Sequence, residues 1–246
     1  MCGVAALQRR ELNEISRILG NNRDEFLDRP TQNAHWHSFD QSLHDDDGGN
    51  ILSGRDEQAG GSWFGVNKAG RVALLTNITE PLGHYKSTRG YLISSFLQSE
   101  STHPLEDELG KIVAPDAVFA GFNLLLLAPS LRPDSNSISY SSLYVTNHGG
   151  GGVLTARPLT SSERSCGCMS NGVDGHGAGD WPKVRHAIDD FTAVLQDLQH
   201  QEQQEDLEAA ATNKNAKGDK PDSPPKAPAK ADLESKLVNG LFQVLS

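Results

Sequence analysis

The stretch SWFGVNKAGRVALLTN, residues 62–77, carries the clearest fold signal in this chain of 246 residues. Its two halves, residues 62–66 and 71–77, are rich in the apolar and β-branched side chains that favour strands. The short segment between them, NKAG at residues 67–70, ends in glycine, as hairpin turns commonly do. The stretch therefore predicts a β-hairpin whose second strand ends at Asn77.

More strands and one helix are expected downstream of this hairpin. Residues 86–98 place leucine and phenylalanine on one helical face, whereas residues 119–128 and 142–147 are apolar runs of strand length. Glycines at residues 149–152 then turn the chain into another short segment, residues 153–159. Strands followed by helices, without regular alternation of the two, predict an α+β domain built in layers.

The C-terminal part of the chain is expected to contain two helices joined by a linker. The first helix has Pro182 in its first turn and an apolar stripe that ends at Leu198. Residues 199–232 consist mainly of Gln, Glu, Ala, Lys and Pro, and they bury too little apolar area to offset the entropy of ordering. The sequence therefore predicts a folded domain over residues 1–198, a disordered linker, and an amphipathic helix over residues 233–246.

The N-terminal segment contains two apolar runs whose structure the pattern leaves open. Residues 2–7 and 15–20 are suited to pair as a hairpin across the polar residues between them. The leucines and isoleucines of residues 12–19, however, also have helical spacing. Residues 30–49 are polar and rich in histidine, which predicts a loop.

Composition and charge argue against several classes of function. The net charge of −10 disfavours binding to a phosphate backbone, so no nucleic-acid partner is expected. No apolar window approaches the roughly 20 residues that span a membrane, and the first residues lack the apolar core of a secretory signal. Three cysteines do not form a disulfide framework. A cytoplasmic protein without a transmembrane segment fits these observations best.

The sequence predicts neither a metal site nor a cofactor. His35, His37, His44 and the aspartates at residues 45–47 match no common zinc or calcium spacing. Residues 166–168 form a C-x-C motif, not a pair of C-x-x-C motifs, and two cysteines on one face of a strand explain it more simply.

Cys2 is the strongest candidate for chemistry. Removal of the initiator methionine would leave a residue with both a thiol and a free α-amine. That amine has an ordinary pKa of about 7.7–8.0, so it can act as a general base on its own side chain at neutral pH.

A polar cluster, NNRDE at residues 21–25, follows soon after Cys2 in the chain. It supplies amide donors, a cation and carboxylates, which are the groups needed to orient the Cys2 amine. The competing interpretation is a turn in which Arg23 pairs with Asp24 or Glu25 and does no chemistry.

Several segments, in chain order from Cys2 to about Leu198, carry a resemblance to a known family. They are the Met-Cys start, NNRDEFLDRPT (21–31), HW (35–36), ILSGRDEQAGGSWFGVNKAGRVALLTN (51–77), RGYLISSFL (89–97), GFNLLL (121–126) and MSN (169–171). Together they resemble the NRDE family, which includes the Transport and Golgi organisation 2 proteins. The resemblance implies an N-terminal-nucleophile (Ntn) hydrolase-like αββα sandwich, with two sheets stacked between helical layers, shortened here at its C-terminus.

A more distant likeness implies roles for individual residues. The turn and strand at residues 66–77 are similar to those of bile-salt hydrolases and penicillin acylases, and Asn77 falls on the oxyanion-binding position of that branch. Asn171 falls on a second active-site asparagine, and residues 22–25 fall where that branch keeps charged residues around its nucleophile. The candidate site residues are Cys2, Asn22, Arg23, Asp24, Glu25, Asn77 and Asn171.

Two functional hypotheses follow from the resemblance. The first is an amidohydrolase in which Cys2 attacks a small amide or acyl substrate. The second is a non-catalytic carrier or trafficking factor for haem or lipid on the same fold. Either would be linked to Golgi organisation and protein secretion, in a cytoplasmic protein that associates peripherally with the Golgi or with mitochondria.

Overall fold

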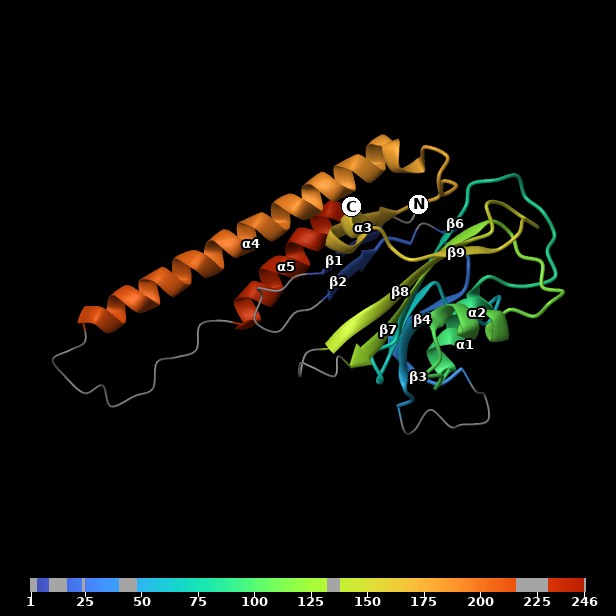
Figure 1. Ribbon diagram of the computed structural model, residues 1–246, viewed down its shortest axis with the longest axis horizontal. Helices are drawn as coiled ribbons and strands as arrows, with labels where there is room; N and C mark the ends of the chain where they lie inside the picture. The colour runs from blue at the N-terminus through green and yellow to red at the C-terminus, as the bar shows by residue number, and fades with distance from the viewer. Residues whose placement is uncertain are drawn as a thin grey trace.

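The computed structural model describes residues 4–8, 17–23, 25–39, 48–131, 138–215 and 230–245, and these residues form two antiparallel sheets with helices on both outer faces (Figure 1). The larger sheet has seven strands in the order β3-β4-β5-β6-β7-β8-β9, and the smaller has three in the order β10-β1-β2. Cys2 and Asp24, from the predicted site, lie outside the described residues.

The strands follow the chain closely within the larger sheet. They are β3 (Thr31–His37), β4 (Ile51–Asp56), β5 (Phe64–Asn67), β6 (Val72–Asn77), β7 (Phe122–Leu131), β8 (Ile138–Thr146) and β9 (Thr155–Arg157). The smaller sheet joins β1 (Val4–Gln8) and β2 (Arg17–Asn21) to β10 (Cys166–Met169), which comes from much later in the chain.

The helices cover the two outer faces, as Figure 1 shows. α1 (Gly90–Gln98) and α2 (Leu105–Ile112) lie on the larger sheet, and α4 (Pro182–Asn215) and α5 (Lys230–Leu245) lie on the smaller one. Two short helices, α3 (Ser161–Ser165) and η2 (Ala178–Asp180), flank β10 and lead into α4.

Three apolar cores separate the four layers, and alternation along single strands builds them. In β7, Leu124 and Leu126 pack with α1 and α2, whereas Leu125 and Leu127 pack towards the smaller sheet. Successive side chains of a strand point to opposite faces, so an uninterrupted leucine run fills two cores at once. The third core packs Ile18 of β2 against α4 and α5. This arrangement confirms the α+β, αββα sandwich.

The hairpin predicted from residues 62–77 is confirmed. β5 and β6 pair in antiparallel register, with Phe64 opposite Leu74. The turn closes when Gly70 donates its backbone N–H to the carbonyl of Asn67 at 2.9 Å, and Gly70 has the positive φ of +82° that a residue with a Cβ seldom adopts.

The open question about the N-terminal runs is settled in favour of the hairpin. β1 and β2 are antiparallel neighbours, with Val4 opposite Asn21. β1 also pairs with β10, where Val4 lies opposite Met169. The N-terminal end of β1 therefore lies between the ends of β2 and β10.

Two expectations need correction. Part of the loop predicted over residues 30–49 is strand β3, which pairs with β4 at the edge of the sheet. An edge strand needs backbone partners on one side only, so most of its side chains stay polar and exposed, and only His37 is buried, against Ser53. The linker was expected from residue 199, but α4 continues to Asn215. Gln, Glu and Ala are strong helix formers even where they bury little surface.

Candidate functional site

A cavity of about 300 Å³ lies where β2 and β6 end. Three of the predicted site residues line it: Arg23, Glu25 and Asn77. Trp63 and Arg89 also line it. Arg23 follows β2 of the smaller sheet and Asn77 ends β6 of the larger one, so the stacking of the two sheets brings these residues together.

Arg23 and Glu25 form the side of the cavity that comes from the NNRDE cluster. The guanidinium of Arg23 lies over the Trp63 ring, 4.2 Å from its centroid, and its Nη2 is 3.9 Å from Oε2 of Glu25. The ion pair expected from the competing interpretation is therefore present. Asn22 is partly buried and directly precedes Arg23.

Asn77, the last residue of β6, lines the cavity and is hydrogen-bonded to Asn171. Nδ2 of Asn171 donates to the backbone carbonyl of Asn77 at 2.7 Å, and Nζ of Lys183 donates to Oδ1 of Asn171 at 3.2 Å. Within the described part of the chain, the side-chain amide of Asn77 has no hydrogen-bond partner. Asn171 therefore positions the strand end, and the amide of Asn77 stays available.

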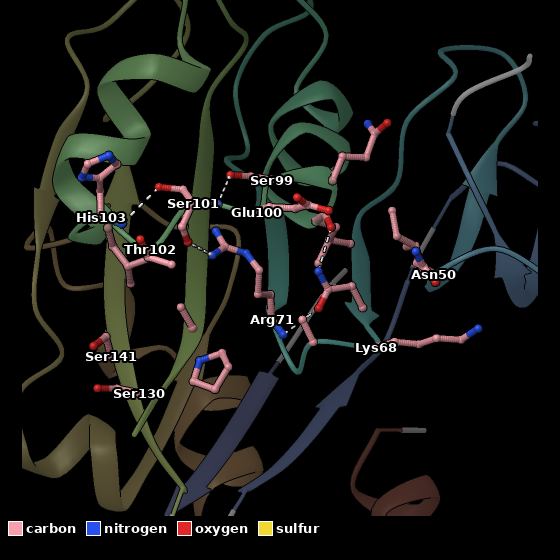
Figure 2. A pocket seen from close by; sticks show the side chains of 18 of the residues that line it. Asn50, Lys68, Arg71, Ser99, Glu100, Ser101, Thr102, His103, Ser130 and Ser141 are labelled. Carbon is pink, nitrogen blue, oxygen red and sulfur yellow. Dashed lines mark hydrogen bonds between the residues drawn. The ribbon is translucent and has the colours of Figure 1, made fainter. Parts of the chain in front are cut away.

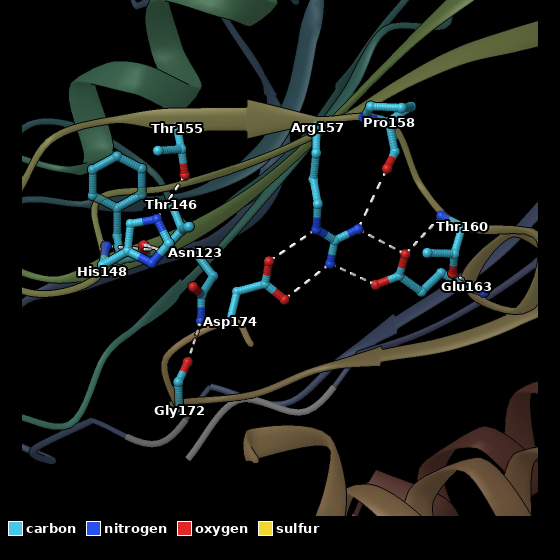
Figure 3. A network of polar contacts seen from close by, with 11 residues as sticks. Asn123, Thr146, His148, Thr155, Arg157, Pro158, Thr160, Glu163, Gly172 and Asp174 are labelled. Atoms are coloured by element: carbon cyan, nitrogen blue, oxygen red, sulfur yellow. Dashed lines mark hydrogen bonds and ion pairs between the residues drawn. The ribbon is translucent and has the colours of Figure 1, made fainter. Parts of the chain in front are cut away.

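Buried polar side chains hold the two sheets together beside Asn77. Oγ1 of Thr76 donates to the carbonyl of Ser170 at 2.7 Å, and Nδ2 of Asn123 donates to the carbonyls of Ser170 and Gly172 at 3.0 and 2.8 Å. Figure 3 shows the bond from Asn123 to Gly172. Sequence reasoning missed these residues, although an asparagine at the head of a leucine run is a signal that a buried amide has a partner.

Arg89 and Glu80 are further groups near the cavity that sequence reasoning missed. Nη1 of Arg89 donates to the carbonyl of Gly121 at 2.9 Å. Glu80 accepts the backbone N–H groups of Gly121 and Gly150, both at 2.6 Å. Burial lowers the pKa of Arg89 below its ordinary value.

Comparison with known proteins identifies the family. The model of the Transport and Golgi organisation 2 family matches residues 1–240. The chain belongs to this family. The Transport and Golgi organization protein 2 homolog of Bos taurus is 35% identical over 118 residues, which are 46% of this chain and 39% of that protein. The Mus musculus homolog is 32% identical over 117 residues, with the same coverage. The matched region thus spans well under half the length of these relatives.

A structural comparison supports the fold. The Caenorhabditis elegans ortholog of N-acylethanolamine-hydrolyzing acid amidase superposes with a TM-score of 0.50 and 13% identity, over 77% of each chain. At this identity the likeness concerns the fold alone, which is Ntn-hydrolase-like.

In this member of the Transport and Golgi organisation 2 family, a larger cavity of about 1480 Å³ lies at the opposite end of β6. Figure 2 shows Arg71 pointing into it towards the Ser101 carbonyl. Its Nε also donates to the carbonyl of Phe96 at 3.2 Å, and its Nη2 pairs with Glu108. None of the predicted site residues that the structure describes lines this cavity.

A separate polar network ties β9 to the segment that follows β10 (Figure 3). Arg157 donates to both carboxylate oxygens of Asp174 and to both of Glu163. The hydrogen bonds from Arg157 lower the pKa of Glu163 to about 2. Glu163 also closes a capping box with Thr160 at the start of α3. The network fixes the chain on both sides of β10, close to Asn171.

Two kinds of feature are absent from the described residues. Among them, no group of three or more His, Cys, Asp or Glu side chains is arranged to bind a metal ion. No helix in the same part of the chain is long and apolar enough to cross a membrane.

Proposed function

We propose that this chain is an Ntn-type amide hydrolase whose nucleophile is the thiol of Cys2. The observation that carries the proposal is the position of the β1 end. Val4 is paired with Asn21 and Met169, which precede Arg23 and Asn171 by two residues each. Val4, the first described residue of β1, therefore lies at the same end of the smaller sheet as the segment that carries Arg23 and Glu25, and these two residues line one cavity with Asn77.

In the proposed reaction, Sγ of Cys2 attacks the carbonyl carbon of an amide while the α-amine takes the thiol proton. Negative charge develops on the carbonyl oxygen, where Nδ2 of Asn77 is available to donate a hydrogen bond. The tetrahedral intermediate then expels the amine, which receives that proton. Water, deprotonated by the α-amine, then attacks the thioester carbonyl carbon. The C–S bond breaks, the thiolate of Cys2 takes the proton back from the ammonium, and a carboxylic acid is released.

The remaining predicted residues support this chemistry. The cation of Arg23 disfavours the ammonium form of the Cys2 amine and so keeps it available as a base. The carboxylates of Asp24 and Glu25 orient the amine, with Asn22 beside them. Asn171 holds the backbone of Asn77 in place through the 2.7 Å hydrogen bond.

Exposed apolar residues that are next in sequence to lining residues favour an acyl group on the substrate. Phe26 and Leu27 are 81% and 106% exposed and follow the lining residue Glu25, and Leu82, 106% exposed, precedes the lining residue Gly83. Exposed apolar side chains beside a cavity offer contacts to an apolar ligand. The same observation suits the second candidate function, a non-catalytic carrier that holds a lipid or haem in the cavity. In either case family membership supports a role in Golgi organisation and secretion, at the cytoplasmic side of the Golgi.

Mass spectrometry of the natively expressed protein separates the two functions. The enzyme requires that Met1 is absent and that a β-lactone probe acylates Cys2 faster than Cys166 or Cys168. Cys2→Ala should abolish both labelling and hydrolysis of N-acyl amides, whereas Cys168→Ala, the matched control, should change neither. Retention of Met1, or acetylation of the Cys2 amine, would remove the base and leave the carrier as the function.

A further inference from the structure

The described residues that line the cavity at the end of β6 include more cations than carboxylates, and the proposed reaction assigns no role to Arg89. Among the described lining residues, three arginines (Arg23, Arg29 and Arg89) face two carboxylates (Glu25 and Asp56). Both carboxylates lie close to Arg29, and Glu25 also pairs with Arg23. Nε and Nη2 of Arg29 donate to Asp56 at 3.2 and 2.5 Å, and Glu25 lies 3.8 Å from the same guanidinium.

Arg89 has several N–H donors that no described residue accepts. Of the five N–H donors of a guanidinium, one donates to the carbonyl of Gly121. No carboxylate in the described part of the chain forms an ion pair with Arg89. Glu80 is close enough to favour its charge, but both oxygens of that carboxylate accept backbone N–H groups.

The Gly121 carbonyl places Arg89 beside the proposed oxyanion donor. That carbonyl accepts Nη1 of Arg89 and also the backbone N–H of Ile78, each at 2.9 Å, and Ile78 directly follows Asn77. A group bound to the remaining donors of Arg89 therefore lies close to a carbonyl bound by Asn77. The positive end of α1, which begins at Gly90 without an acidic residue in its first turn, adds to the field there.

We propose that Arg89 binds an anionic group, a carboxylate or a phosphate, on the substrate and thereby determines which amides the site accepts. A planar guanidinium with parallel N–H groups matches both anions in a bidentate manner. Arg23, which lies over the Trp63 ring and 3.9 Å from Glu25, supplies a second cation to the same cavity. The favoured substrates are therefore N-acyl compounds whose amine part carries a negative charge.

Burial strengthens this preference. A partly buried cation without an ion-pair partner is destabilised by lost hydration, as the lowered pKa of Arg89 indicates. An anion that binds it restores the lost interaction. A neutral ligand of the same shape does not, and it leaves donors in the site unsatisfied. The site should therefore discriminate by charge more than by shape.

The test is titration calorimetry on the full chain with Cys2→Ala, so that no turnover occurs. Three probes share one acyl chain: N-octanoylethanolamine (neutral), N-octanoylglycine (carboxylate) and N-octanoyl-O-phosphoethanolamine (phosphate). Both anionic probes should bind at least about tenfold more tightly than the neutral one, as expected for charge-assisted hydrogen bonds. The tighter of the two anions identifies the natural group as carboxylate or phosphate.

Substitutions then assign the preference to Arg89. Arg89→Gln should remove it and leave the affinity for the neutral probe within about twofold. Arg89→Lys, which keeps the charge but not the planar fork, should retain part of it. Arg185→Gln is the control, because Arg185 is 64% exposed and pairs with Asp180 outside the cavity.

Two outcomes would overturn the proposal: equal binding of all three probes to the Cys2→Ala protein, or an equal loss for all three in Arg89→Gln. If Arg89→Gln does not fold, Arg89→Lys is the deciding variant. Complete loss of the preference for anionic probes in a folded Arg89→Lys protein would contradict the proposal. The inference rests on the proposed function for the reaction. Because binding is measured without the nucleophile, failure of the hydrolase proposal and failure of this one give different results.

Discussion

The two ends of strand β6 each lie beside a cavity, but they use buried charge in opposite ways. At the start, Arg71 donates to two backbone carbonyls and pairs with Glu108, and the two side chains are 6% and 3% exposed. At the other end, Arg89 makes one hydrogen bond to a described residue, and the amide of Asn77 makes none. We call these the closed end and the open end of β6.

The difference shows why cavity size alone is a poor guide to function here. The larger cavity lies at the closed end, where the buried cation already has its partners and contributes to the fold. The smaller cavity lies at the open end, where donors remain available for a ligand. Charge at the closed end should therefore affect stability, and charge at the open end should affect binding and catalysis.

The largest effect is expected from Glu108→Ala at the closed end. The substitution leaves the Arg71 guanidinium buried without its carboxylate, which typically costs about 3–5 kcal/mol of unfolding free energy. Urea denaturation monitored by circular dichroism measures the loss. Binding of the anionic probes should be unchanged at temperatures where the variant is folded.

Glu100→Ala is the matched control for this substitution. Glu100 lines the same cavity but is exposed, so the change should stay within about 0.5 kcal/mol. Equal destabilisation by Glu108→Ala and Glu100→Ala would mean that the Arg71–Glu108 pair does not support the fold, and the description of the closed end would be wrong.

The next effect is expected from Asn77→Ala at the open end. Removal of an oxyanion donor typically lowers kcat by about 10²–10³-fold, which corresponds to roughly 2.7–4 kcal/mol in the transition state. Because the side chain is exposed and has no hydrogen-bond partner among the described residues, the unfolding free energy should change little. Steady-state hydrolysis of N-acyl amides, together with a urea titration, measures both quantities.

Asn67→Ala is the corresponding substitution at the closed end. The Asn67 side chain accepts the backbone N–H of Arg71 at 2.9 Å and donates to the carbonyl of Leu97 at 2.8 Å. Its loss should lower stability by about 1–3 kcal/mol and leave kcat unchanged. If Asn67→Ala slows hydrolysis as much as Asn77→Ala does, the proposed role of Asn77 is lost.

Local patterns predicted most of the fold because each core depends on alternation within a strand. The leucine run of β7 and the hairpin of β5 and β6 are examples, since their periodicity fixes which side chains are buried. β3 was not predicted, because an edge strand is held by backbone hydrogen bonds, and its polar side chains show no apolar alternation in the sequence. The extension of α4 over residues 199–215 was not predicted, because low hydrophobicity suggested disorder there whereas the high helix propensity of Gln, Glu and Ala favours a helix.

The site was predicted less completely, because its contacts join distant parts of the chain. Resemblance led to Arg23, Glu25 and Asn77, which line one cavity, and to Asn171, which holds Asn77. Nothing local marks the contact between Thr76 and Ser170, which are 94 residues apart. Arg89 could have been found from the sequence. A cation at a helix N-terminus is electrostatically unfavourable, which suggests that it serves a function other than helix stability.

The smallest effect is expected at the ion-pair network of Arg157, Glu163 and Asp174, which fixes the chain on both sides of β10 near the open end. Arg157 pairs there with Glu163 and Asp174, in contacts that are about one-third exposed and therefore partly screened by solvent. The folded-state pKa of Glu163, about 2, lies below its ordinary value of 4.5. Its carboxylate therefore stabilises the fold above pH 4.5, and this contribution is lost as the pH falls towards 2.

Glu163→Gln should accordingly lower the melting temperature at neutral pH, and the difference from the wild type should shrink as the pH falls below 4.5. The Gln side chain cannot gain or lose the proton, so the shrinking difference reports the titration of Glu163 itself. Asp180→Asn is the control, because the Asp180–Arg185 pair has side chains that are 77% and 64% exposed and should contribute almost nothing at any pH. A difference that is constant with pH would show that Glu163 acts through its capping hydrogen bonds with Thr160, which Gln retains in part, and not through its charge beside Arg157. The open end would then depend on the fold of α3 and not on the ion pairs around β10.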